Sequence, residues 1–323
     1  MREIHVTSKE EGQRFDKLLG KYLNQAPKSF LYKMLRKKNI KLNGKKASGN
    51  EKLKDGDCVQ IYLSEDTIEN FRKTLKIQKQ TMSLHVIYED QNVLLINKPW
   101  GVLSQKAKPT DISINEQIVP YAIERGLMSE KDLQMVTPSI CNRLDRNTTG
   151  IVIGGISLEG LQTMSKMLKE RTIDKYYLCI VKGKLTKNKK ISGYLVKNHQ
   201  KNTVVVSKEQ KGQGAWIETS YEPLASERDF TLLRVKLVTG KTHQIRAHLA
   251  SIGHPILGDF KYGDRRINEW AKRKFGLNSQ LLHCGELRFP AKMTGCRELE
   301  KKIIKAPLPK EFQKIKDELF GGL

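Results

Sequence analysis

Short apolar segments bounded by turn-forming residues recur from residue 81 onward, and this pattern restricts the fold more than any other feature. The clearest pair is residues 85–88 and 93–96, because the Glu-Asp-Gln-Asn between them is typical of a hairpin connection. Further segments of similar length, rich in β-branched and aromatic residues, are residues 151–153, 177–181, 203–206, 216–221 and 231–238. Short strands joined by turns predict a sheet that is largely antiparallel.

Two helices are predicted among these strands. Residues 158–168 place apolar side chains along one side, and Ser157 precedes them as a helix cap. Residues 244–252 can form the second helix. Many hairpin-like strands with few helices predict an α+β fold, with a mostly antiparallel mixed sheet in residues 81–323.

The first 63 residues follow another pattern. Residues 14–25 have an apolar stripe at helical spacing, and a second amphipathic helix is expected to start at Ser29 as its cap. Apolar and polar residues then alternate before the turns Asn43-Gly44 and Asp55-Gly56-Asp57. A small α/β module is therefore expected, followed by a polar linker at residues 64–80 and a larger domain at residues 81–323.

Basic residues are concentrated in this small module, where residues 1–63 contain 15 basic and 7 acidic side chains. A solvated charged face would be the simplest explanation. However, S-x-F-L-x-K-M-L-R-K-K, followed by I-K-L-N-G-K and D-G-D, resembles the alpha-L RNA-binding domain over about residues 12–63. The resemblance implies docking on structured RNA through phosphates. The residues assigned to this contact are Lys33, Arg36, Lys37, Lys38, Lys41 and Lys45.

The whole chain is also strongly basic. Its 59 lysines and arginines exceed its aspartates and glutamates by 24, which predicts a polyanionic partner. A membrane surface is the competing polyanion, but no apolar segment approaches the roughly 18 residues needed to span a bilayer, and the first residues lack a signal-peptide core. We therefore expect a cytoplasmic protein with no membrane partner.

Neither a metal nor a nucleotide cofactor is predicted. The five cysteines form no C-x-x-C pair and no cluster with zinc-ligand spacing. Gly240-Lys241-Thr242 resembles the end of a phosphate-binding loop, but Val235 occupies the position where that loop needs a glycine. His243 and His248 have no cysteine or acid at ligand spacing and are expected to be hydrogen-bonded supports.

One carboxylate stands out in the stretch CNRLDRNTTGIVIGG. Asp145 lies between Arg143 and Arg146, just ahead of a predicted core strand. A structural salt bridge with a neighbouring arginine would explain an arbitrary R-x-D. A loop at the start of a core strand can also hold a reactive group rigidly, and a guanidinium beside it would keep the acid ionised. Asp145 is therefore a candidate nucleophile or base.

Four sequence blocks resemble the pseudouridine synthases that modify large-subunit ribosomal RNA. Asn142-Arg143-Leu144-Asp145-Arg146-Asn147-Thr148-Thr149-Gly150 resembles the H-R-L-D-x-x-T-S-G motif of that family. The other blocks are a strand with K-P-x-G at residues 90–101, a K-x-Y-x-A-x-V-x-G strand at residues 175–183, and G-R-T-H-Q-I-R-x-H-L followed by I-G-H-P-I-x-G-D at residues 240–263. With the front module, the resemblance covers about residues 12–290.

The resemblance implies a role for several positions. Asp145 stands where the family has its catalytic aspartate, Tyr177 where a tyrosine stacks on the target base, and Arg246 where a basic residue pairs with the carboxylate. Arg143 stands where an arginine helps to hold the RNA open, and Thr148 of the same motif is assigned to RNA contact. From its sequence alone, Tyr177 would rather be a core tyrosine. Departures are Asn142 for histidine, Thr149 for serine, Lys241 for arginine and Cys179 for alanine.

The implied reaction is the isomerisation of uridine to pseudouridine, with the target base flipped out and no cofactor. Attack on the sugar, attack on the base and removal of the 2′ proton by Asp145 all stay open. Lys98, before Pro99, is expected to be either structural or phosphate-facing. Two alternatives also remain: a binding factor with a degenerate catalytic fold, and an enzyme that acts on transfer RNA or another small RNA. We expect a monomer.

Overall fold

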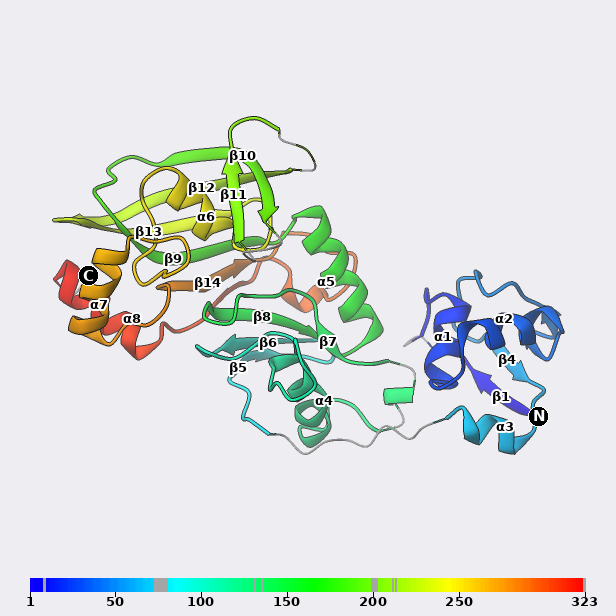
Figure 1. Cartoon of the computed structure of the whole chain (residues 1–323). Coiled ribbons are helices and arrows are strands. Elements are labelled where there is room, and N and C mark those ends of the chain that lie inside the picture. Colours follow the sequence, from blue (N-terminus) through cyan, green and yellow to red (C-terminus); the bar gives the residue numbers. More distant parts are fainter. Residues whose placement is uncertain are drawn as a thin grey trace.

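The first 72 residues build a hydrophobic cluster of their own around a four-stranded sheet (Figure 1). The structure is a computed structural model that describes residues 1–7, 10–72, 81–130, 132–134, 136–198, 203–210, 212 and 214–321. The strand order is β1-β4-β2-β3. Its elements are β1 (Arg2–His5), α1 (Phe15–Tyr22), α2 (Lys28–Arg36), β2 (Ile40–Leu42), β3 (Lys45–Lys46), β4 (Cys58–Ile61) and α3 (Glu65–Asn70).

The local predictions for this front unit hold with small shifts. The stripe of α1 is buried, and Asn43 and Gly44 both have positive φ, as a two-residue hairpin turn with the right twist requires. Helix α2 begins at Lys28 with Pro27 as its N-cap, so the prediction of Ser29 as the cap is wrong. Pro27 makes no side-chain hydrogen bond to the helix, and its ring fixes φ at −59°, which suits the start of a helix.

The predicted linker begins with structure. Helix α3 is capped by Ser64, which accepts a hydrogen bond from the Thr67 amide at 3.3 Å. Ile68 is fully buried in the front cluster, and Phe71 lies 4.6 Å from Phe30 between ring centroids. Ile68 and Phe71 thus attach α3 to the front unit, although the composition of this segment is mostly polar. Residues 73–80 of the predicted linker lie outside the described residues.

An eleven-stranded sheet forms the rest of the protein. The strand order is β11-β10-β12-β13-β9-β14-β8-β6-β5, with β15 paired to β14 and β7 paired to β8. The strands are β5 (Val86–Glu89), β6 (Val93–Lys98), β7 (Ser139–Ile140), β8 (Thr149–Gly155), β9 (Asp174–Lys182), β10 (Lys189–Asn198), β11 (Thr203–Ser207), β12 (Ala215–Glu227), β13 (Phe230–Leu237), β14 (Leu282–Arg288) and β15 (Ile303–Lys305). Among the named strands of the described chain, only β8 and β14 pair in parallel. The predicted α+β fold with a mostly antiparallel sheet is confirmed.

Helices cover this sheet at several places (Figure 1). They are α4 (Ile114–Glu124), α5 (Leu158–Glu170), α6 (Gln244–Ser251), α7 (Arg265–Phe275) and α8 (Lys310–Phe320), with short 3-10 turns η1 (Asp132–Gln134) and η2 (Arg297–Leu299). Along β9 the side chains alternate: Tyr177 and Cys179 point into the main hydrophobic cluster, while Ile180 joins the cluster built with α7 and α8. Strand β9 is therefore central to the fold.

The sequence analysis missed several of these elements. Helices α4, α7 and α8 and strands β1, β10, β14 and β15 were not predicted. In the basic segments 187–190 and 272–275, β10 starts at Lys189 and α7 continues to Phe275, with the lysines exposed. In these segments basic residues interrupt the short apolar patterns, so the patterns are not recognised in the sequence.

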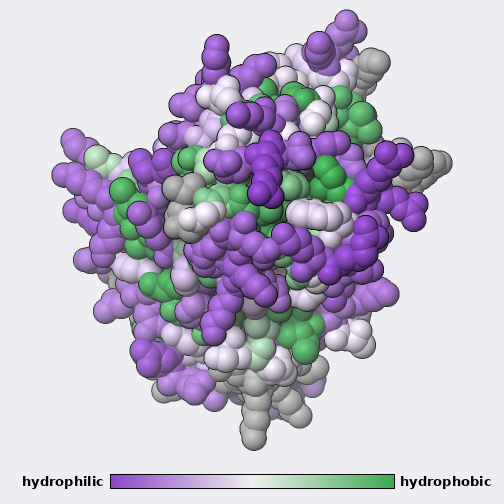
Figure 2. All heavy atoms as spheres, turned by 90° about the vertical axis from the view of Figure 1, so that its left-hand side faces the viewer, coloured by the Kyte–Doolittle hydropathy of each residue, from purple (hydrophilic) through white to green (hydrophobic). Residues whose placement is uncertain are grey.

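The surface agrees with the charge of the sequence. The face that carries α7 and α8 is mostly hydrophilic, and hydrophobic side chains form small separate patches on it (Figure 2). No helix in the described part of the chain is long and apolar enough to cross a membrane.

Candidate active site

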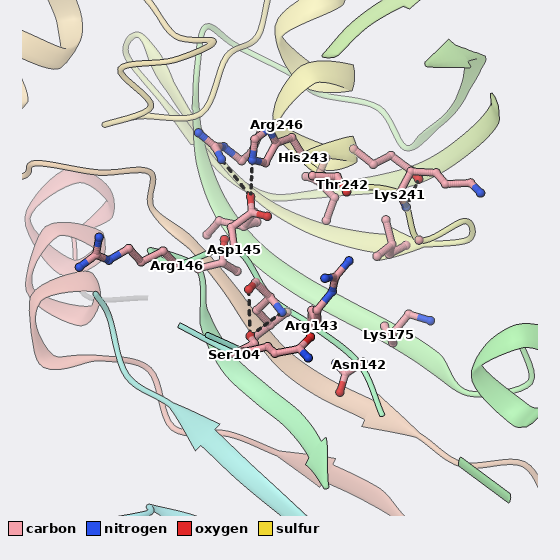
Figure 3. Close-up of a pocket in the computed structure, with 18 of the residues that line it drawn as sticks. Ser104, Asn142, Arg143, Asp145, Arg146, Lys175, Lys241, Thr242, His243 and Arg246 are labelled. Carbon is pink, nitrogen blue, oxygen red and sulfur yellow. Dashed lines mark hydrogen bonds and ion pairs between the residues drawn. The ribbon is translucent and has the colours of Figure 1, made fainter. Parts of the chain in front are cut away.

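A cavity of about 750 Å3 lies between residues 141–148 and residues 240–246 (Figure 3). Tyr177 of β9 and Leu282 of β14 contribute to its wall. The cavity thus combines parts of the chain that are far apart in sequence, residues 103–107 among them. Of the residues predicted to act together, Asp145, Tyr177, Arg246, Arg143 and Thr148 all line it.

The segment that carries Asp145 is held by hydrogen bonds on several sides. Ser104 Oγ accepts from the Leu144 amide at 3.0 Å and donates to the Leu144 carbonyl at 2.9 Å. The Thr148 amide donates to the Asp145 carbonyl at 3.0 Å. These contacts fix the backbone on either side of the carboxylate, as a preorganised site requires.

Asn142 and Gly150 complete this support. Asn142 Oδ1 accepts from the Ile153 amide at 2.7 Å, so its side chain bonds to β8 and points away from Asp145. The amide found in place of the family histidine thus holds the segment to the sheet. Gly150 has a φ of +103°, and a Cβ there would lie 2.2 Å from the Cys284 carbonyl oxygen. Only glycine allows β8 and β14 to approach so closely.

Lys98 also holds the segment that carries Asp145 in place. Its side chain is fully buried, and its Nζ donates to the carbonyls of Pro99, Val102 and Arg146 at 3.0, 2.8 and 2.8 Å. Burial lowers the pKa of Lys98 to about 7, and the charge of Asp145 opposes this shift. Of the two interpretations of Lys98, the structural one is confirmed, and the phosphate-facing one is wrong because no part of the side chain is exposed.

Asp145 and Arg246 form the central ion pair of the cavity. Arg246 Nη1 donates to Asp145 Oδ2 at 2.9 Å, across 101 positions of sequence. The other edge of the guanidinium binds Asp259, with Nε and Nη2 at 2.7 and 2.9 Å from its two oxygens. Burial lowers the pKa of Arg246, but the two carboxylates outweigh this effect, so the pKa is raised overall. Asp259 therefore orients the arginine that faces Asp145.

The side chains of Asp145, Arg246 and Asp259 differ in their exposure to solvent. The side chains of Asp259 and Arg246 are 1% and 8% exposed, whereas that of Asp145 is 23% exposed. The carboxylate thus has one oxygen held by a buried cation and faces the cavity. The sequence analysis gave no role to Asp259, although it ends the I-G-H-P-I-x-G-D block.

His243 lies beside the pair. It precedes α6 in a left-handed conformation, and its Nε2 is 3.8 Å from Asp145 Oδ2. Its Nδ1 is 2.8 Å from the Tyr262 hydroxyl. Burial lowers the pKa of His243, Arg246 adds to this effect and Asp145 opposes it, so the ring is neutral at neutral pH. His248 hydrogen-bonds Thr219 at 2.9 Å. Both histidines are hydrogen-bonded, as predicted.

Tyr177 belongs both to the core and to the wall of the cavity. Its side chain belongs to the main hydrophobic cluster and is only 6% exposed, yet it lines the cavity. Burial raises the pKa of Tyr177 well above its usual value, and a hydrogen bond with Cys284 adds to this effect. The phenol therefore stays protonated and presents an uncharged ring to the cavity.

Cationic side chains surround the opening. Arg143 is exposed, and Thr148 is 2% exposed, with its hydroxyl accepting from Gln280 at 3.3 Å. Several further residues that line the cavity were not assigned to catalysis or RNA contact in the sequence analysis. They include Ser104, Lys106, Arg146, Lys175, Lys241 and His243. Lys175 had a usable signal, because it is two positions before Tyr177 and alternate residues of a strand share a face. Burial lowers its pKa.

The basic residues predicted for the front module lie in a different part of the molecule. Five of them are exposed, at the end of α2 and in the hairpin after it: Lys33, Arg36, Lys37, Lys38 and Lys45. Lys41 is half-buried, with its Nζ 5.0 Å from the centre of the Tyr62 ring. None of the six lines the cavity.

One group of potential metal ligands also lies in the front sheet. Glu3 and His5 of β1 and Cys58 of β4 place one ligand atom each within 4.8 Å of one another. Sequence spacing could not show this group, because strand pairing brings His5 opposite Cys58. It is exposed and separate from the cavity.

Comparison with known proteins gives a consistent result. The family model of RNA pseudouridylate synthase matches residues 92–251. Ribosomal large subunit pseudouridine synthase C of Escherichia coli (strain K12) is 31% identical over 323 residues, covering 98% of this chain and 96% of that protein. The enzyme of the same name from Vibrio vulnificus (strain CMCP6) is 30% identical, with coverages of 98% and 96%.

A solved structure has a similar fold. Human RNA Pseudouridylate Synthase Domain Containing 4 superimposes with a TM-score of 0.58 at 21% identity, covering 72% of this chain and 92% of that one.

Proposed function

The chain belongs to the RNA pseudouridylate synthase family, and we propose that it converts specific uridines of large-subunit ribosomal RNA to pseudouridine with Asp145 as its reactive group. The observation that carries this proposal is the Asp145–Arg246 pair, with an N–O distance of 2.9 Å, inside a large cavity edged by cations. The relatives named for this reaction align with nearly the whole chain.

The reaction breaks the C1′–N1 bond, turns the uracil and joins it to the sugar through C5. No atom is gained or lost, and the chemistry requires no redox agent or energy source. Among the described residues that line the cavity, Asp145 is the only carboxylate. This differs from the pair of carboxylates that glycoside hydrolases normally use. Asp145 acts on the sugar, on the base or on the 2′ proton, with Arg246 compensating its charge when water is excluded.

Base flipping brings the uridine into the cavity. Unstacking a base costs a few kcal/mol. Contact with the ring of Tyr177 and phosphate contacts with Arg143 and the other cations at the opening offset that cost. We also propose that Thr148 contributes through its hydrogen bond with the Asp145 backbone, which shapes the floor under the substrate.

On this proposal, the front unit docks the protein on its RNA substrate. Residues 1–63, with α3 packed on them, act as an RNA-binding module, residues 73–80 connect this unit to the rest of the chain, and residues 81–323 carry catalysis. Exposed cations at the end of α2 suit phosphate contacts on structured RNA. We further propose that the protein works as a monomer in the cytoplasm, without a metal or other cofactor. Removal of divalent metal would then leave a prefolded substrate reactive.

The decisive experiment maps pseudouridine in total RNA from cells that lack the protein. We expect sites in large-subunit ribosomal RNA to be missing, to return with the wild-type protein, and to stay missing with Asp145→Asn. Restoration by Asp145→Asn would contradict the proposed mechanism. Loss in transfer RNA instead would redirect the substrate assignment, and no loss at all would favour a factor that only binds RNA.

A further inference from the structure

A second cavity, of about 160 Å3, borders the segment that carries Asp145. Residues of this segment line one cavity or the other: Asp145, Arg146 and Thr148 line the first, whereas Asn147 and Thr149 line the second. Leu282 lines both. The two cavities therefore share this segment and Leu282 as parts of their walls.

Trp100 is the most prominent side chain of this second cavity. It is 52% exposed, although its indole N–H donates to the Ser279 hydroxyl. The backbone on both sides is held as well, because Lys98 Nζ binds the Pro99 carbonyl and Arg146 Nε donates to the Gly101 carbonyl at 3.0 Å. A large aromatic ring is thus kept in place with half of its surface open to solvent. Such a ring can stack on a base with little loss of conformational entropy.

The rest of the lining suits a base better than a phosphate. Asn147 and Asn278 offer amide donors and acceptors, and the carboxylate of Glu311 accepts hydrogen bonds but repels anions. Pro309 and the buried Phe312 add apolar surface. Apolar walls with a few hydrogen-bonding groups match the faces and the edge of a heterocycle. The neighbouring cation Arg146 is exposed and favours a polyanionic chain at this place.

We propose that this cavity is a second base-binding subsite, in which Trp100 stacks on an unpaired base that neighbours the target uridine. The inference rests on the proposed function and adds a residue that selects the RNA. Trp100 occupies the unspecified position of the K-P-x-G block. Stacking there offsets part of the cost of opening the RNA around the target.

The test combines a protein change with a change in the RNA. The probe is a synthetic RNA hairpin that carries the mapped uridine, with abasic residues placed in turn at the positions beside it. Binding is measured with Asp145→Asn protein, so that turnover does not alter the probe. We expect Trp100→Ala to weaken binding of the intact hairpin about tenfold and to change binding of one abasic hairpin by less than twofold. Trp100→Phe should restore most of the affinity.

Trp216 offers a matched control. It is 47% exposed on β12 and lines neither cavity. Trp216→Ala should bind intact and abasic hairpins as the parent protein does. A protein that keeps Trp100 as its only tryptophan, through Trp216→Phe and Trp270→Phe, gives an independent measurement. Its fluorescence should be quenched by the intact hairpin and far less by the abasic hairpin that Trp100 fails to discriminate.

Two results would overturn the subsite. One is equal weakening of every hairpin by Trp100→Ala, which indicates a loss of structure or of general affinity. The other is unchanged binding together with unquenched fluorescence. Failure of the proposed function looks different, because wild-type protein would then form no pseudouridine in the intact hairpin, whatever residue stands at position 100.

Discussion

Positive charge is used in two different ways in this molecule. In the cavity, Arg246 is 8% exposed and fixed by two carboxylates, at N–O distances of 2.7 to 2.9 Å. At the end of α2, Lys33, Arg36, Lys37 and Lys38 are exposed. A buried, paired charge acts strongly over a short range in fixed geometry, whereas exposed charges act over longer distances and are screened by salt. On the proposed function, the buried charge serves the chemistry and the exposed charges serve docking.

The largest effect is expected for Arg246→Ala. The substitution leaves Asp145 and Asp259 close together without their cation, so turnover should fall by roughly 10² to 10³-fold. The free energy of unfolding should fall by about 3 to 5 kcal/mol, because a buried ion pair is broken. Single-turnover assays and urea unfolding measure the two quantities.

Lys236→Ala is the control for this change. Lys236 pairs with Asp174 at 2.7 Å, but the two side chains are 38% and 37% exposed. Its removal should cost about 0 to 1 kcal/mol and leave turnover intact. Arg246→Ala with wild-type turnover would show that the two kinds of charge do not differ in function.

An intermediate effect is expected when the four cations of α2 are replaced by glutamine. RNA affinity should fall about tenfold or more, and the plot of log affinity against log salt should become shallower by about three, because counterion-releasing contacts are lost. The loss should raise KM and spare kcat. Binding is measured over a salt series with the hairpin and with large-subunit ribosomal RNA.

Four exposed lysines near β10 and β11 provide the comparison: Lys187, Lys189, Lys190 and Lys208. Their replacement by glutamine removes the same net charge from another surface. Equal salt slopes for the two quadruple variants would mean that overall charge, and not the front unit, attracts RNA. A large fall in kcat of the α2 variant would join docking to chemistry.

The smallest effect is a difference in acid sensitivity between the two regions. Burial lowers the pKa values of His248 and His283 to about 4, and His283 hydrogen-bonds Thr149 at 2.8 Å next to the Asp145 segment. The unfolded rings have a pKa near 6.5, so the unfolded state binds more protons as the pH falls. Stability should therefore fall between pH 6.5 and pH 4, by up to about 1.4 kcal/mol per pH unit for each ring.

Hydrogen exchange at pH 7 and pH 5 can assign this loss to a region. Amides of β8 and β14 should lose protection at pH 5 before those of β1 and β4. His248→Asn and His283→Asn should each flatten the pH dependence while lowering stability at pH 7. An equal loss in the front sheet would point to a general acid effect.

Sequence patterns predicted strands that carry a short run of apolar residues, such as β6 and β8. They failed for α7 and α8, where charged residues dominate and only a narrow stripe, including Ala271 and Phe312, packs on the sheet. Strand β1 was missed because only one of its residues, Ile4, packs against the front cluster. In these segments contacts with the rest of the fold decide the structure, and local pattern does not.

The site divides in the same way. Asp145, Tyr177 and Arg246 were predicted through the resemblance, and they line one cavity. Asp259 was not assigned a role, because its hydrogen bonds with Arg246 depend on how the chain folds back over the 13 positions between the two residues. The role of Lys98 depends on which carbonyls surround its ammonium group, and no pattern shows those. Asn142, which replaces the histidine of the family motif, bonds to β8.

The long sequence separation between Asp145 and Arg246 determines when their ion pair can form during synthesis of the chain. The front sheet is complete once Ile61 is available to pair with Arg2. Asp145 gains Arg246 only when the chain has grown past residue 246, and the arginine is fully oriented only when Asp259 has followed. On the proposed function, a nascent chain still attached to its ribosome would bind RNA through its front unit before it could rearrange a nucleoside, so activity would begin only late in translation.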